Sequence, residues 1–77
     1  MSQGDDWYRQ LATSDRLIVE ARKHVQDVTA QISSLERQRR DTRKAVARLQ
    51  LLEQTLRWLL EHRAVILKQV RAHPLPE

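Results

Sequence analysis

Cysteine, phenylalanine and asparagine are absent from this chain of 77 residues, which has one glycine and two prolines. Without cysteine it has neither a disulfide framework nor a thiolate zinc site. Turns between strands need clusters of Gly, Pro, Asn and Asp, yet neither Gly nor Pro occurs between residues 5 and 73. Together with an aromatic content of 4%, this scarcity argues against a sheet protein and favours long helices.

Long apolar runs are also missing, since none approaches the roughly 18 residues that span a bilayer. The first six residues are acidic and have no apolar core of the kind found in secretory signals, so we expect a cytoplasmic protein. A chain of this length allows one small domain with a marginal core. Because disulfides and thiolate metal sites are excluded, self-association is the remaining source of stability, and we expect a homodimer.

Residues that could carry catalysis are scattered. His24, His62 and His73 form no ligand pair one helical turn apart, and Ser33 and Ser34 have no adjacent base. No Gly-rich phosphate loop occurs. We therefore expect a protein that is not an enzyme, with no catalytic residue, metal, cofactor or small-molecule substrate.

Apolar residues in the first half of the chain recur at alternating spacings of three and four. This spacing predicts a narrow seam of coiled-coil type along one side of a helix, made of Ile18, Ala21, Val25, Val28, Ile32 and Leu35 and extended backwards by Trp7, Leu11 and Ser14. The second half has a seam of its own, made of Val46, Leu49, Leu56, Leu60, Leu67 and Val70. It is wider, as in a bundle helix that contacts several neighbours, because four more apolar residues flank it: Ala45, Leu52, Leu59 and Ile66.

Two all-α architectures fit these seams. One is an antiparallel helical hairpin, of which two copies form a four-helix bundle. The other is one helix over residues 6–72, about 100 Å long at 1.5 Å per residue, in a parallel coiled coil. The heptad register continues through the middle without a Gly or Pro, which favours the rod, but the rod places charge at core positions such as Arg39 and Arg63. We predict the hairpin dimer.

The predicted hairpin domain covers residues 6–73, between tails at residues 1–5 and 74–77. Its first helix spans about 6–37, the turn about 38–41 and the second helix about 42–72. Asp5 or Asp6 is expected to cap the first helix, and Asp41 or Thr42 the second.

The net charge of +4 comes from residues 36–48, which contain two anions, Glu36 and Asp41, and six cations: Arg37, Arg39, Arg40, Arg43, Lys44 and Arg48. Clustered arginines can bind phosphates, but no aromatic residue lies among them to stack on bases. We rank a solvated, charged connection above nucleic-acid binding. In this ranking, a basic patch that docks onto an acidic protein surface comes between these two interpretations.

Leu51, Trp58 and Val65 recur every seven residues in a row continued by Ala72, about 140° from the centre of the main stripe at 100° per residue. Tryptophan is enriched at binding hot spots, and His62 flanks the row. The row is either a surface that docks another protein or one that packs within the dimer, with Trp58 against the first helix or against the sister subunit. The sequence leaves both interpretations open.

This inventory is typical of a binding protein. We expect a small regulator or inhibitor that docks onto a larger partner protein through a helical face, in the style of phage or mobile-element products that block host proteins, or of secretion chaperones. Its partner-binding residues would be Leu51, Trp58, His62 and Val65, with the basic residues steering the encounter. The alternatives are a dimeric nucleic-acid-binding protein using residues 37–48 and a purely structural coiled-coil segment. Neither a membrane nor a small-molecule partner is expected.

The residues expected in the core and dimer are Ile18, Val25, Val28, Ile32, Leu35, Leu49, Leu52, Leu56, Leu59, Leu60, Ile66 and Leu67.

Overall fold

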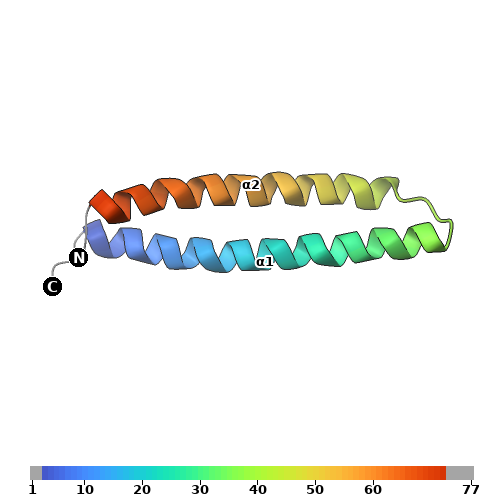
Figure 1. Cartoon of the computed structure of the whole chain (residues 1–77), viewed down its shortest axis with the longest axis horizontal. Coiled ribbons are helices and arrows are strands. Elements are labelled where there is room, and N and C mark those ends of the chain that lie inside the picture. The colour runs from blue at the N-terminus through green and yellow to red at the C-terminus, as the bar shows by residue number, and fades with distance from the viewer. Residues whose placement is uncertain (1–2, 73–77) are drawn as a thin grey trace.

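The computed structural model describes residues 3–72, with side chains from residue 6 onward. They form two helices, α1 (Gln3–Arg37) and α2 (Arg43–Ala72), which run antiparallel along each other from a turn at one end (Figure 1). The hairpin measures 59 × 16 × 15 Å. The predicted all-α hairpin is confirmed, and the alternative of one continuous helix is wrong.

The ends of the helices differ slightly from the predicted bounds. The helix α1 begins at Gln3, so residues 3–5 belong to it and not to a tail, and Asp5 and Asp6 lie inside its first turn instead of capping it. Its last residue is Arg37, as predicted, and α2 begins one residue later than expected. The predicted C-terminal tail at residues 74–77 lies outside the described residues.

One side of each helix builds the seam between them. The α1 side keeps the predicted spacing of three and four, and all its members are buried or half-buried: Trp7, Leu11, Ser14, Ile18, Ala21, Val25, Val28, Ile32 and Leu35. The α2 side consists of Ala45, Leu49, Leu52, Leu56, Leu59, Arg63, Ile66 and Val70. Ile18, Ala21 and Leu59 form a buried cluster with Leu56 against it, while Ile66 is only 1% exposed.

The α2 seam is centred one row away from the predicted one. Val46 and Leu60, which were expected at its centre, are 36% and 41% exposed, whereas Ala45, Leu59 and Ile66, which were expected to flank it, are buried. The row of Leu49, Leu56, Arg63 and Val70 belongs to both seams. The difference is that Ala45, Leu52, Leu59 and Ile66 complete the observed seam in place of Val46, Glu53, Leu60 and Leu67. Both of these rows are mostly apolar, so the spacing of apolar residues did not choose between them.

The turn forms without a glycine. The amide of Arg39 donates to the carbonyl of Glu36 (3.0 Å) and that of Arg40 to the carbonyl of Leu35 (2.9 Å), which is the hydrogen-bond pair of a Schellman motif. This motif needs a left-handed residue after the helix, and Arg39 takes that conformation with φ of 56°. The position usually belongs to glycine, which explains why the turn left no obvious mark in the sequence.

Two charged contacts fix the hairpin at its ends. The Asp41 carboxylate accepts a hydrogen bond from the Arg43 amide at the start of α2 (2.9 Å) and pairs with the Arg43 guanidinium. Asp41 thus provides the predicted cap. Near the other end, Arg63 Nε donates to Asp15 Oδ1 at 2.5 Å, so the seam arginine meets a carboxylate of α1. This pairing offsets the cost of a charge at a seam position.

Candidate partner-docking surface

The predicted docking row (Leu51, Trp58 and Val65) lies on α2 outside the seam. Its side chains are 65%, 59% and 54% exposed. Trp58 therefore does not pack into the seam with α1, which excludes one of the two internal packing arrangements considered for it. Three large apolar side chains spaced one heptad apart remain on one line along the helix.

Trp58 forms an aromatic stack with a residue of its own helix. The imidazole of His62, one turn further along α2, stacks on the indole with ring centroids 5.0 Å apart and planes 6° from parallel. Residues four apart on a helix meet in this way. The stack limits the freedom of an exposed tryptophan before any partner arrives, and less side-chain entropy is then lost on binding.

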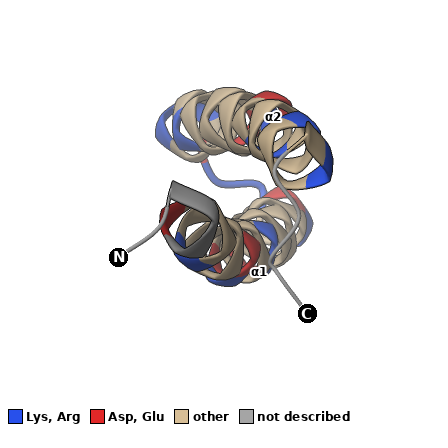
Figure 2. Cartoon of the chain, turned by 90° about the vertical axis from the view of Figure 1, so that its left-hand side faces the viewer, with Lys and Arg blue, Asp and Glu red and all other residues tan. Residues whose placement is uncertain are grey.

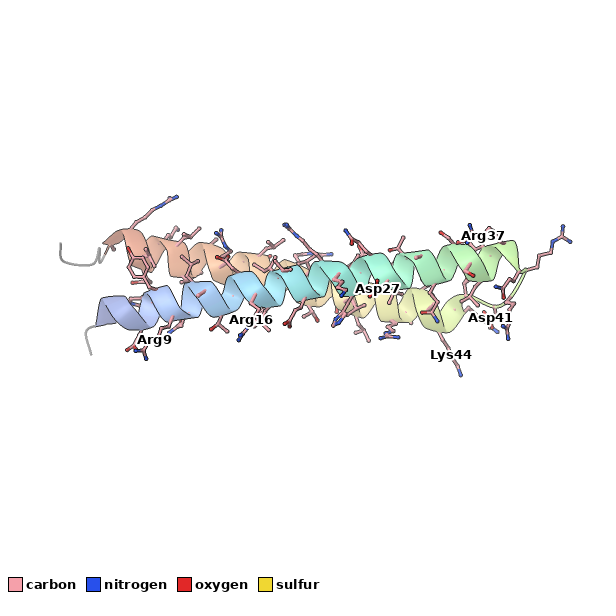
Figure 3. All side chains as sticks on the ribbon, turned by 90° about the horizontal axis from the view of Figure 1, so that it is seen from below. Arg9, Arg16, Asp27, Arg37, Asp41 and Lys44 are labelled. Carbon is pink, nitrogen blue, oxygen red and sulfur yellow. The ribbon has the colours of Figure 1, made fainter. Side chains whose placement is uncertain are left out.

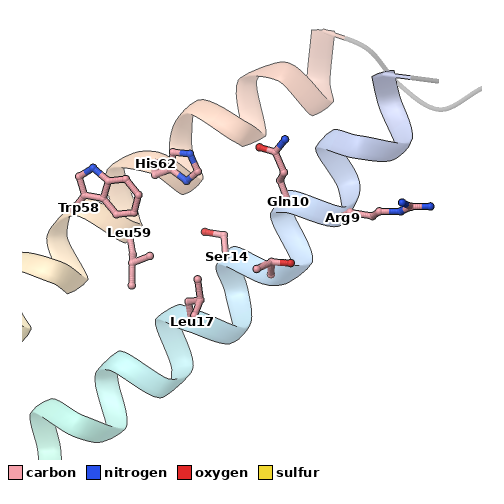
Figure 4. Close-up of a pocket in the computed structure, with 8 residues that line it drawn as sticks. Arg9, Gln10, Ser14, Leu17, Trp58, Leu59 and His62 are labelled. Carbon is pink, nitrogen blue, oxygen red and sulfur yellow. The ribbon is translucent and has the colours of Figure 1, made fainter. Parts of the chain in front are cut away.

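A groove of about 260 Å³ opens beside this stack, between α1 and α2 (Figure 4). We call it the Ser14 groove. Trp58, Leu59 and His62 line it from α2, and its α1 wall consists of Arg9, Gln10, Thr13, Ser14 and Leu17. Figure 4 shows that Arg9 extends away from the opening whereas Ser14 points toward α2. The inner surface is therefore mainly apolar.

Ser14 is the polar residue of this groove that lacks a partner. It is 4% exposed, and its Oγ is the one buried side-chain polar atom among residues 6–72 without a hydrogen bond. The hydroxyls of Thr29 and Thr55 instead bond back to carbonyls one turn earlier, Thr29 to that of Val25 (2.7 Å) and Thr55 to that of Leu51 (3.0 Å). Buried polar groups are nearly always paired, so this hydroxyl is an unsatisfied polar group in the wall of the groove.

Half of this surface was not predicted from the sequence. Leu51, Trp58, His62 and Val65 all come from α2, whereas Ser14 and the 41%-exposed Leu17 come from α1. The contribution of α1 depends on how the helices pair, and the seam pattern of α1 gave no reason to single out Ser14.

The six predicted basic residues gather at the turn end of the hairpin, at the end of α1, in the connection and at the start of α2, and all are exposed. The connection is blue in Figure 2, and Figure 3 shows Arg37 and Lys44 at that end, near Asp41. The Arg43 side chain and its amide hydrogen-bond to Asp41 and lower the pKa of that carboxyl, while the pKa of Arg43 is raised. Arg43 is therefore less free to meet a ligand than its neighbours.

Among residues 3–72 no group of three His, Asp or Glu side chains is placed to hold a metal ion. Neither α1 nor α2 has the apolar length that crossing a membrane would require. What the described surface offers chemically is an apolar row, a stacked aromatic pair and a groove with one free hydroxyl.

Comparisons of the chain with protein-family models, with curated proteins and with solved structures give no match.

Proposed function

We propose that this protein is a small, non-enzymatic regulator or inhibitor that binds a larger partner protein through the docking row and the adjoining Ser14 groove. The observation that carries the proposal is the 59% exposure of Trp58 while its ring is stacked on His62. Tryptophan is among the residues most enriched at binding hot spots. Its burial by a partner would remove a large apolar surface from water.

The Ser14 groove suggests what the partner inserts. Its volume of about 260 Å³ is below the roughly 300–1,000 Å³ of small-molecule pockets, which favours a single side chain from another protein. A buried hydroxyl without a partner costs about 1–3 kcal/mol. A side chain with an apolar body and a polar tip would recover this energy while it fills the apolar groove.

The basic end of the hairpin supports a role in the approach of the partner. Exposed cations at one end raise the rate at which an acidic surface is encountered, and they affect that rate more than the final affinity. Arg37, Arg40 and Lys44 are exposed. We therefore propose a partner with an acidic region next to the surface that receives Trp58.

Self-association completes the proposal. Two hairpins would form a four-helix bundle in the cytoplasm, with α2 at the centre because α2 exposes the large apolar side chains of Val46 and Leu60 in addition to the docking row. A hairpin of two helices has little core of its own.

The test is affinity capture from source-cell lysate followed by measurement of binding between the purified proteins. Trp58→Ala is compared with Val19→Ala, which removes an apolar side chain that is 67% exposed on α1 and outside the Ser14 groove. A hot spot of at least 2 kcal/mol predicts a loss of about 30-fold for Trp58→Ala and little change for Val19→Ala. Equal binding by wild type and Trp58→Ala would remove the docking row from the proposed function.

A second candidate function, nucleic-acid binding, has one observation in its favour, which is that all six cations lie at one end. It predicts an affinity that falls steeply with salt and a loss of binding when Arg37, Arg40 and Lys44 are changed together to Gln. Recovery of nucleic acid in the capture experiment, with unchanged recovery by Trp58→Ala, would place this function first.

A further inference from the structure

Helix α2 has a second apolar row, on a different side from the docking row. We call it the side row: Val46, Leu60 and Leu67. Val46 and Leu60 are 36% and 41% exposed, and Leu67 is half-buried. On the helix surface the side row lies next to the seam row of Leu49, Leu56, Arg63 and Val70, and Glu53 holds its fourth position. The side row therefore extends the mainly apolar side of α2 outward from the seam.

The docking row is bordered on α2 by polar residues. The helical positions between it and the seam hold Arg48, Thr55, His62 and Gln69, and Trp58 reaches the core residue Leu59 through the Ser14 groove. An apolar surface continuous with a core resembles the interfaces of permanent dimers, which look like a domain core cut in half. An isolated row centred on tryptophan within polar surroundings resembles a hot spot with its rim.

The chain exposes more surface than a compact monomer of its mass. Its accessible surface is 6308 Å², whereas a compact monomer of 9.1 kDa exposes about 4,900 Å². The excess of about 1,400 Å² is larger than the roughly 800 Å² that each partner buries in a standard interface. The Cα radius of gyration of 17.4 Å likewise exceeds the roughly 11–12 Å of a compact domain of this length.

We propose that a second copy of this chain covers the side row, with α2 antiparallel to α2 of the other copy about a two-fold axis. This assigns a surface to the self-association included in the proposed function. With the axis at the level of Leu56 and Arg57, the heptad spacing puts Val46 opposite Leu67 of the second copy. The docking row then remains on the outside of the dimer.

Charge on the same side of α2 fits this arrangement. Glu53 holds the side-row position between Val46 and Leu60, and Arg57 follows one turn later. Both are exposed, and the ion pairs among the described residues, which join Asp41 to Arg43 and Asp15 to Arg63, do not include them. Across the two-fold axis Glu53 comes within one turn of Arg57 of the second copy, and symmetry makes this contact twice.

The occupant is a copy of this chain because the surface is complementary to itself. Under one symmetry operation Val46 meets Leu67 of the second copy, and Glu53, which lies opposite Leu60, comes within one turn of the Arg57 guanidinium. A groove of about 410 Å³ beside Leu60, whose rim carries both Asp15 and Arg22, continues this mixed-sign pattern onto α1. A surface of mixed sign at the edge suits an identical copy better than a strongly acidic partner.

The first test measures molar mass by light scattering or sedimentation at micromolar concentration for wild type, Leu60→Glu and Leu51→Glu. The two variants make the same change on one helix, in the side row and in the docking row. We expect the mass of two chains for wild type and Leu51→Glu and of one chain for Leu60→Glu, with circular dichroism reporting helix content. A monomeric wild type, or a dimeric Leu60→Glu beside a monomeric Leu51→Glu, would overturn the proposal.

The second test covers the case in which Leu60→Glu is both monomeric and unfolded. Glu53→Arg and Arg57→Glu each reverse one exposed charge, and the double variant restores opposite signs. Each single variant should dissociate at a higher concentration than wild type, and the double variant should recover most of the loss. Single variants that dimerise like wild type would show that this side of α2 is not the interface. Because the docking row is unchanged in them, partner capture by these variants tests the docking proposal separately.

Discussion

Replacing Ser14 by alanine is expected to make the hairpin more stable. The Ser14 hydroxyl is buried and has no hydrogen-bond partner within residues 6–72. Removing such a group relieves a desolvation cost of about 1–3 kcal/mol, and alanine adds about 0.5 kcal/mol of helix propensity. The cavity left by one oxygen atom offsets a small part of this gain.

The matched control is Ser33→Ala, the same substitution at an exposed position of α1. Ser33→Ala gains the same helix propensity but relieves no desolvation cost, because its hydroxyl is in water. Its free energy of unfolding should therefore rise by only about 0.5 kcal/mol. Urea unfolding followed by circular dichroism, at one protein concentration because dimerisation also stabilises, gives both free energies. Equal gains for the two variants would show that the Ser14 hydroxyl already has a partner, and the groove would then have no free group for a ligand.

Ser14→Ala is expected to lower the affinity for the partner although it raises the stability of the hairpin. If a partner side chain bonds to Ser14, then Ser14→Ala weakens partner binding while it raises the free energy of unfolding. Residues that are unfavourable for folding and favourable for binding are common at functional sites. A variant that is both more stable and a better binder would contradict the role assigned to this hydroxyl.

Three further predictions concern the fold. Arg39→Gly should stabilise the hairpin by roughly 0.5–1 kcal/mol in urea unfolding. The substitution relieves about 1–2 kcal/mol of left-handed strain, and part of that gain is lost because glycine makes the unfolded chain more flexible. A loss of stability would contradict the left-handed turn geometry of Arg39. Ile66→Ala removes the most buried side chain and should lower the free energy of unfolding by about 2–5 kcal/mol. That is a large share of the roughly 4–12 kcal/mol of total stability expected for a chain of this length. A change below about 1 kcal/mol, well under the usual cost, would mean that Ile66 is not in the core. Arg43 lowers the pKa of Asp41 from 3.8, so the stabilisation by the charged carboxylate is present above pH 3.8 and is lost as the pH falls through the lowered pKa. The stability difference between wild type and Asp41→Asn, measured by thermal unfolding, should therefore shrink below pH 3.8. A constant difference would exclude this linkage.

The pattern of α1 was sufficient to place its buried side. The alternation of three and four from Trp7 to Leu35 identifies residues that are all buried or half-buried in the structure, because a narrow apolar stripe leaves one choice of face. On α2 the stripe was too wide for that. Apolar residues predominate in three adjacent rows, which begin at Ala45, Leu49 and Val46, and the rows of Ala45 and Leu49 are the ones that pack against α1.

The turn and the groove required tertiary information. No local feature of the sequence indicates that Arg39 takes a left-handed conformation, and the prediction of a hairpin depended instead on the cost of charges in a continuous coiled coil. The pairing of Arg63 with Asp15 joins residues 48 positions apart, which periodicity cannot supply. The meeting of Ser14 with Trp58 and His62 likewise depends on the stagger of the two helices.

The central claim is that the Trp58 side of α2 stays open to a partner when two copies of the chain have assembled. Fluorescence of Trp58 in a Trp7→Phe variant tests it most directly, because Trp58 is then the single tryptophan. Emission and acrylamide quenching are measured while the protein concentration is raised through the dimerisation range, with light scattering on the same samples. If the Trp58 side stays open, we expect a red-shifted, strongly quenched indole at every concentration. A blue shift and protection from acrylamide that grow in step with dimer formation would contradict it.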